Sequence, residues 1–151
     1  MNKAYSETGV GLMPGPSLRE RLQPEAFAQD VGVEITDAGS GWCETALVLL
    51  PRHLSADGTV YAGVLSLVLE YTAGLAASTV VDDDECVRIV EAKANLLRPA
   101  RGNKLRCRSQ VVRQGSMILG VGSEVFAHSL RQKSLVARAL VTLSITDKPK
   151  P

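Results

Sequence analysis

The chain has 151 residues, of which 45% are hydrophobic and 22% are charged, and its formal net charge is +1. This length suits one domain with a buried core, and the composition is ordinary for a globular protein. A net charge of +1 gives little electrostatic attraction to nucleic acid or to an acidic membrane. Aromatic residues make up only 4% of the chain, too few for a base-stacking platform, so no nucleic-acid partner is expected.

The first segment, residues 1–16, contains three glycines, two prolines and no hydrophobic periodicity, which predicts a flexible arm. It lacks the apolar core of a signal peptide. A single domain is expected over residues 17–146, followed by a tail over 147–151. Three cysteines, Cys43, Cys86 and Cys107, lie far apart and do not follow metal-ligand spacing. We therefore expect reduced thiols in a cytoplasmic protein, with no metal and no cofactor.

The next segments change from helical to strand periodicity. Residues 17–30 have helical character, interrupted or restarted at Pro24. Alternating hydrophobic residues over 31–50 predict two strands joined by the turn DAGSG, and PRHLSADG, residues 51–58, predicts a loop.

A long apolar segment over residues 60–80 predicts a helix that is hydrophobic on nearly every side, with Glu70 as its one ionisable group. At about 30 Å the run is long enough to cross a bilayer core. The central carboxylate, the small and polar residues within it and the lack of nearby Lys or Arg argue against a membrane span. A buried carboxylate is costly unless it is paired, hydrogen-bonded or neutralised, so Glu70 requires an explanation.

Four more strands are expected after an acidic loop at residues 82–85, which lacks the ligand spacing of a calcium site. They cover residues 86–97, 104–112, 117–127 and 134–145, and their short connections favour an antiparallel meander. The predicted fold class is α+β, a long helix packed on a curved antiparallel sheet of five or six strands. Because the helix is apolar on nearly every side, a second subunit is expected to cover its remaining surface.

This pattern resembles the hotdog fold, and within it the acyl-CoA thioesterases of the phenylacetate-degradation type. The resemblance covers about residues 24–146 and is densest in HLSADGTVYAGVLSLVLEYTAGLAA, residues 53–77. Members of this family usually carry a His, a short polar step with Asn or Gln, a Gly, then His-Gly-Gly, and an Asp or Glu nine residues after the second His. Counted from Tyr61, the ninth residue is Glu70.

The chain departs from the family pattern at four positions. Tyr61 replaces the usual His, Ala62 the first Gly and Ser55 the Asn or Gln. Gly74 stands where related aryl-CoA thioesterases carry Ser or Thr, four residues after the carboxylate. The resemblance implies hydrolysis of an acyl-CoA thioester to a carboxylic acid and free coenzyme A, by a homodimer or homotetramer. Because of these departures, a second interpretation remains, in which the chain is a non-catalytic protein that binds acyl-CoA or lipid. A dehydratase is disfavoured because it needs a His beside the carboxylate.

Helix geometry constrains how the candidate site is built. Tyr61 and Glu70 point to opposite sides of one helix, about 13 Å apart along its axis, so they cannot share a small site within one chain. Two antiparallel helices related by a two-fold axis bring the start of one beside the middle of the other. The backbone N–H groups of Ala62 and Gly63 would then stabilise an oxyanion. Glu70 would act as a general base or as a nucleophile, two roles that the sequence does not separate.

Further residues are candidates for substrate binding. Tyr61 either donates a hydrogen bond to the thioester or lines an acyl pocket. Ser55 either holds water or substrate or is a plain loop residue, and His53 is interpreted as ordering the loop. Arg98 and Arg101 flank a predicted tight turn, where they are candidates for contact with the phosphates of coenzyme A.

Overall fold

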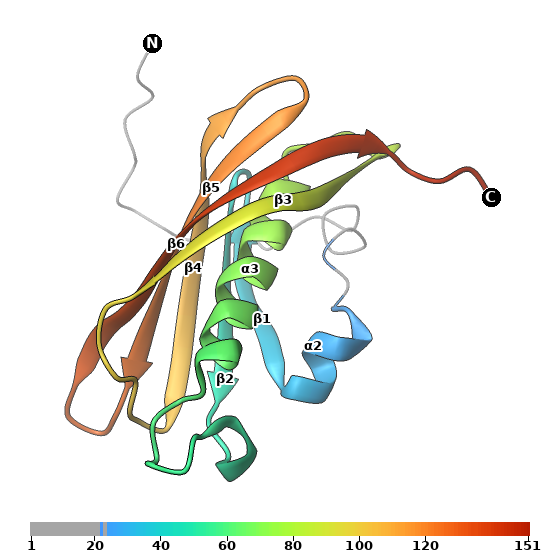
Figure 1. Cartoon of the computed structure of the whole chain (residues 1–151). Helices are drawn as coiled ribbons and strands as arrows, with labels where there is room; N and C mark the ends of the chain where they lie inside the picture. Colours follow the sequence, from blue (N-terminus) through green and yellow to red (C-terminus); the bar gives the residue numbers. More distant parts are fainter. Residues whose placement is uncertain (1–21, 23) are drawn as a thin grey trace.

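The computed structural model describes residue 22 and residues 24–151, so the predicted arm over residues 1–16 lies outside the described residues. The elements, in chain order (Figure 1), are α2 (Ala26–Val31), β1 (Val33–Gly39), β2 (Trp42–Val48), the 3-10 turn η1 (Pro51–His53), α3 (Ala62–Ser78), β3 (Glu85–Leu96), β4 (Lys104–Gln114), β5 (Ile118–His128) and β6 (Lys133–Asp147).

The six strands form one antiparallel sheet in the order β1-β2-β4-β5-β6-β3. The predicted meander is correct for β4, β5 and β6 and wrong for β3, which pairs with β6 instead of β4. The edge of β4 that a meander would offer to β3 is occupied by β2, where Thr45 lies opposite Cys107. Residues 97–103 therefore cross the end of the sheet instead of closing a hairpin, and β3 becomes an edge strand.

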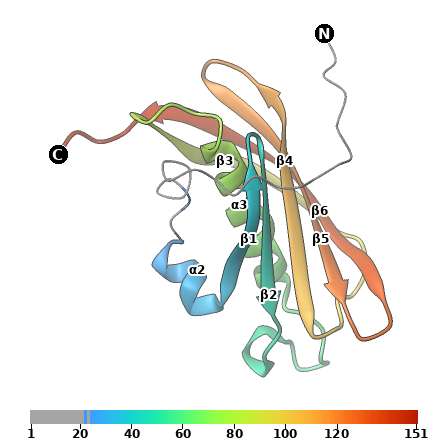
Figure 2. The same ribbon diagram turned by 180° about the vertical axis from the view of Figure 1, so that it is seen from behind.

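Helix α3 lies against the inner face of the sheet, whose strands curve around it (Figures 1 and 2). It begins and ends two residues inside the predicted limits of 60 and 80. The sequence predicts that a second subunit covers the part of the helix that the sheet leaves open, and in the single chain Leu67, Glu70 and Gly74 are half-buried and Gly63 is exposed. The residues buried toward the sheet form the opposite stripe: Leu65, Val68, Leu69, Thr72, Ala73, Leu75, Ala76 and Ala77.

Buried hydroxyl groups fasten α3 to the sheet. The Thr72 hydroxyl donates a hydrogen bond to the carbonyl oxygen of Val68 at 2.7 Å, and its oxygen lies 2.7 Å from the hydroxyl oxygen of Thr45 on β2. The Ser123 hydroxyl on β5 donates to the carbonyl oxygen of Leu69 at 3.1 Å. Because a buried hydroxyl without a partner is costly, these bonds favour one rotation of α3 about its axis and keep its open face away from the sheet.

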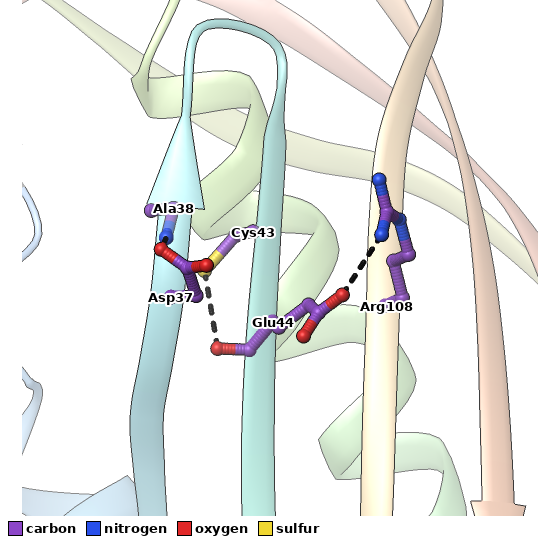
Figure 3. Close-up of polar contacts among 5 residues, drawn as sticks. All are labelled: Asp37, Ala38, Cys43, Glu44 and Arg108. Atoms are coloured by element: carbon purple, nitrogen blue, oxygen red, sulfur yellow. Dashed lines mark hydrogen bonds and ion pairs between the residues drawn. The ribbon is translucent and has the colours of Figure 1, made fainter. Parts of the chain in front are cut away.

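Strand β2 alternates between the two faces of the sheet, as its sequence predicts (Figure 3). Cys43 is fully buried, and burial raises the pKa values of Cys43 and Cys107 to about 12, so both are protonated core thiols. On the outer face, the Glu44 carboxylate bonds to the Arg108 guanidinium at 2.9 Å, and Arg108 lies over the Trp42 ring at 5.2 Å. These outer contacts join β2 to β4 and support the register of the two strands.

Candidate functional site

The first turn of α3 presents unpaired backbone donors. Tyr61 is the N-cap residue with an extended backbone (φ −60°, ψ 135°), and no side chain caps the helix. The N–H groups of Val64 and Leu65 both donate to the Tyr61 carbonyl oxygen, at 2.9 and 3.4 Å. The N–H groups of Ala62 and Gly63 have no acceptor within the described part of the chain, as expected for the first residues of a helix. These donors are exposed at the positive end of the helix dipole, where an anion is favoured.

The Tyr61 side chain lies beside these donors. A Cβ added at Gly63 would stand 3.0 Å from a ring carbon of Tyr61, so the ring packs against the first turn of α3. Tyr61 is 61% exposed, which leaves its face and its hydroxyl open to a ligand. Tyr61 is expected either to line an acyl pocket or to donate a hydrogen bond to the thioester, and this position suits either role.

His53 holds the loop that leads into α3. The Leu50 N–H donates to Nδ1 of His53 at 3.0 Å, so the proton of the neutral ring is on Nε2, which donates to the Val31 carbonyl oxygen at 2.8 Å. Gly32, with φ 98°, ends α2 in the left-handed conformation and turns the chain into β1. The His53 carbonyl oxygen in turn accepts the Tyr61 N–H at 2.9 Å. Both ring nitrogens are thus engaged within the chain, and the buried imidazole orders the approach to α3, as the sequence interpretation has it.

The loop preceding α3 is also tied to the β3–β4 connection. Asp57 accepts hydrogen bonds from the Thr59 hydroxyl at 2.7 Å and from the Thr59 N–H at 3.0 Å, and these bonds lower the pKa of the Asp57 carboxyl. Arg101 donates to the Asp57 carbonyl oxygen at 3.1 Å, which places a cation beside the loop that leads into the start of α3. Ser55 lies in the same loop, where its N–H donates to the Thr59 carbonyl oxygen at 2.7 Å. Arg98, three residues before Arg101 in the same connection, is exposed and forms no hydrogen bond with the loop in the described structure.

Glu70 lies in the middle of α3 on the open face of the helix. It is half-buried and forms no hydrogen bond or ion pair with any residue that the structure describes. Its side chain lines an open groove of about 710 Å³ between α2, α3 and β3. Glu70 is therefore half-buried in the single chain, because α3 buries only the opposite stripe against the sheet.

Two aromatic residues of the groove were not singled out from the sequence. Phe27 of α2 is 65% exposed although it is large and apolar, and Tyr71 follows Glu70 on α3; both line the groove. Burial raises the pKa of the Tyr71 hydroxyl, which has no hydrogen-bond partner among the described residues. A lone aromatic residue in an apolar segment gives no signal that separates a groove from a core position.

The structure thus contains two half-sites on one helix. The predicted residues His53, Ser55, Tyr61, Ala62, Gly63 and Arg101 gather around the amino end of α3. Glu70 lies about 13 Å along the helix from Tyr61, consistent with the spacing expected from the sequence. In the described residues no group of three or more His, Cys, Asp or Glu could hold a metal ion. The chemistry available is a pair of backbone donors and a free carboxylate.

Comparisons with known proteins find similarity to thioesterases and esterases. The model of the Thioesterase superfamily matches residues 57–133. A Haemophilus influenzae protein named "Putative esterase" is 28% identical over 98 residues, which are 65% of this chain and 71% of that protein. A solved structure of a thioesterase family protein from Silicibacter pomeroyi has a TM-score of 0.83 at 23% identity, covering 87% of this chain and 97% of that one. A phenylacetic acid degradation-related protein from Ralstonia eutropha has a TM-score of 0.74 at 25% identity, covering 84% and 95%.

The likeness to these thioesterase structures confirms the predicted hotdog fold, an α+β arrangement of one long helix on a six-stranded antiparallel sheet. It also confirms the resemblance to thioesterases that include a phenylacetic acid degradation-related protein. No helix in the described part of the chain is long and apolar enough to cross a membrane.

Proposed function

Since this chain belongs to the Thioesterase superfamily, we propose that it hydrolyses an acyl-CoA thioester to a carboxylic acid and free coenzyme A, at a site shared by two protomers. Family membership supports thioester hydrolysis in general. The acyl-CoA substrate and the shared site are the specific parts of the proposal.

One observation carries the proposal: among the described residues, two backbone donors at the amino end of α3 and a carboxylate near its middle have no partner. A thioester carbonyl that is attacked by a nucleophile develops negative charge on its oxygen. The N–H groups of Ala62 and Gly63 are suited to stabilise that charge, and the positive end of the helix dipole adds to the effect. Glu70 activates the attacking water by removing its proton, or attacks the carbonyl carbon itself.

The two half-sites meet only between chains. A straight α-helix holds the donors of the first turn and Glu70 about 11 Å apart along its axis. At this distance they cannot both contact the same thioester carbonyl group. A two-fold axis that sets two α3 helices antiparallel brings Glu70 of one chain to the amino end of the other. Each dimer then has two equivalent sites. The open, half-buried face of α3 is the surface that such a dimer would cover.

Coenzyme A is the thiol carrier that the charges favour. Arg101 is exposed beside the loop that precedes α3, and its planar guanidinium is well suited to a phosphate group. Arg98 lies in the same connection between β3 and β4. A basic connection close to the amino end of α3 fits a substrate whose reactive thioester is joined to a phosphorylated carrier.

The first experiment measures thiol release from a panel of acyl-CoA substrates by the parent and by Glu70→Gln. We expect the substitution to lower kcat about 100- to 10,000-fold, the range for loss of a general base, with folding and assembly unchanged. Parental turnover by the variant would refute the role of Glu70. Calorimetric binding of acyl-CoA by a parent that releases no thiol would select the alternative, a non-catalytic binding protein.

A second variant tests the backbone donors. Ala62→Pro removes one N–H at the first helical position, where proline is well tolerated, and the extended backbone of Tyr61 already suits a residue before proline. We expect kcat to fall about 100- to 1,000-fold, as for loss of one oxyanion donor, while the melting temperature is retained. Unchanged kcat would exclude this donor from the mechanism.

Mixing the two inactive variants tests the shared site. In a mixed dimer, one site combines both defects and the other combines the intact Glu70 with the intact amino end of α3. Random exchange makes about half of the dimers mixed, each with one intact site, so about a quarter of parental activity should return. If each site belonged to a single chain, mixing would restore nothing.

A further inference from the structure

Gly74 is an unexpected residue in the middle of α3. Glycine within a helix lowers stability relative to alanine, because it has more backbone freedom to lose on folding. Close packing commonly explains such a glycine, but a Cβ added at Gly74 would meet no atom within 4 Å. The described residues therefore supply no steric reason for the glycine at this position.

The space over Gly74 belongs to the groove that contains Glu70. Residues 70 and 74 are one turn apart and lie on the same face of α3. The groove follows α3 from Leu67 to Ser78, roughly 16 Å along the helix. Its apolar lining comes from four elements: Phe27 and Ala28 of α2, Leu67, Tyr71 and Leu75 of α3, Val87 and Ile89 of β3, and Leu143 of β6.

The two ends of the groove differ in chemistry. One end holds the free carboxylate of Glu70. The other lies beyond the end of α3, where Glu85 and Lys148 line it and the Lys148 ammonium donates to the Asp83 carbonyl oxygen at 2.6 Å. Glu25 and Arg88 also line the groove, and most of the remaining wall is apolar. An extended apolar group attached to a reacting carbonyl at Glu70 matches this arrangement, since its tail would lie against apolar side chains along α3.

We propose that the acyl group of the substrate lies in this groove across Gly74, and that the missing side chain at this position admits long, extended acyl groups. The inference rests on the proposed thioester hydrolysis and adds its substrate class and a residue that determines specificity. Gly74 takes no part in the chemistry. The same open space would suit a helix of a second subunit packed closely on α3, and the experiment separates that occupant from an acyl chain.

The test compares the parent, Gly74→Ala and Gly74→Leu on butyryl-, octanoyl- and dodecanoyl-CoA. Each methylene excluded from an apolar groove weakens binding about fourfold, so a leucine side chain that displaces three methylenes should lower kcat/KM for dodecanoyl-CoA about 50-fold. Turnover of butyryl-CoA should change less than about threefold, because a short acyl group ends before Gly74. The alanine variant should fall between the parent and the leucine variant for the longer substrates.

Gln29→Leu is the matched control, since it adds a leucine side chain at an exposed position of α2 that does not line the groove. It should leave the chain-length preference unchanged. Light scattering on each variant reports assembly. A uniform loss with all three substrates, or dissociation caused by Gly74→Leu alone, would overturn the inference and assign the space to a partner subunit.

Failure of the proposed function has a different result, namely that the parent hydrolyses none of the three substrates. Calorimetry with intact dodecanoyl-CoA then tests the groove without any turnover. Binding by the parent that weakens about 50-fold in Gly74→Leu would support an apolar acyl site at Gly74. Equal binding by both proteins, or no binding by the parent, would overturn it.

Discussion

The hydroxyl pair that joins α3 to β2 should show a marked asymmetry between its two members. Thr45 and Thr72 are fully buried, with their hydroxyl oxygens 2.7 Å apart. Thr72 donates its single hydroxyl proton to the Val68 carbonyl oxygen, so Thr45 must be the donor within the pair. Thr45→Val removes that donor and leaves the bond from Thr72 to Val68, which should cost about 1 kcal/mol of unfolding free energy.

Thr72→Val is expected to be the more damaging substitution, because it leaves the Thr45 hydroxyl buried without an acceptor. An unsatisfied buried hydroxyl costs about 1–3 kcal/mol. The double variant removes both groups and should be more stable than Thr72→Val alone by about 1 kcal/mol. Urea unfolding at one fixed protein concentration measures all four proteins, and unchanged m values would show that only stability changed. Additive losses, with the double variant the least stable, would refute the assignment of donor and acceptor.

Two further predictions concern titratable groups. Cys86 should react with a thiol reagent in the native protein, whereas Cys43 and Cys107, buried and with pKa values raised to about 12, should react only on unfolding; labelling followed by mass spectrometry tests this. Burial and, after it, nearby cations led by Lys133 lower the pKa of His128 from its usual 6.5, so its NMR titration midpoint should lie below that value. The unfolded state then binds more protons just below pH 6.5, so stability should fall as pH drops through this range, and a midpoint at or above 6.5 would contradict the assignment.

Local patterns in the sequence were sufficient for most of the architecture. The strands of residues 104–145 alternate over most of their length because one face of each packs on α3 and the other does not, with register shifts at Val111/Arg113 and Val125/Phe126. The position of β3 was not predictable in the same way. Its connection to β4 is short enough to suggest a hairpin, but sheet order depends on which edge is free, and β2 had already occupied the edge of β4. Pairing between segments distant in sequence leaves no signal in either segment alone.

The sequence names the residues of the candidate site, and the structure adds where each of them lies in the chain. Helical spacing alone separates Glu70 from the first turn of α3, and the resemblance supplied the rest of the set. The sequence indicates that part of α3 is left for a second subunit to cover. It does not show which residues form that face, because Leu67 and Gly74 look as apolar as the residues that face the sheet. Phe27 and Tyr71 were missed for a related reason, since an aromatic residue on a groove wall has the same sequence signature as one in a core.

The departures from the family pattern fall into two physical classes. Ala62 stands where the family pattern has a glycine, and since the proposed role belongs to the backbone N–H, the methyl group leaves that donor intact. Gly74 replaces a hydroxyl-bearing residue and leaves open space one turn from Glu70. The first change preserves the proposed oxyanion stabilisation, and the second removes a polar neighbour from the carboxylate. If both proposals hold, this chain keeps the minimal catalytic pair of donor and base and uses the vacated space to admit a longer apolar acyl group.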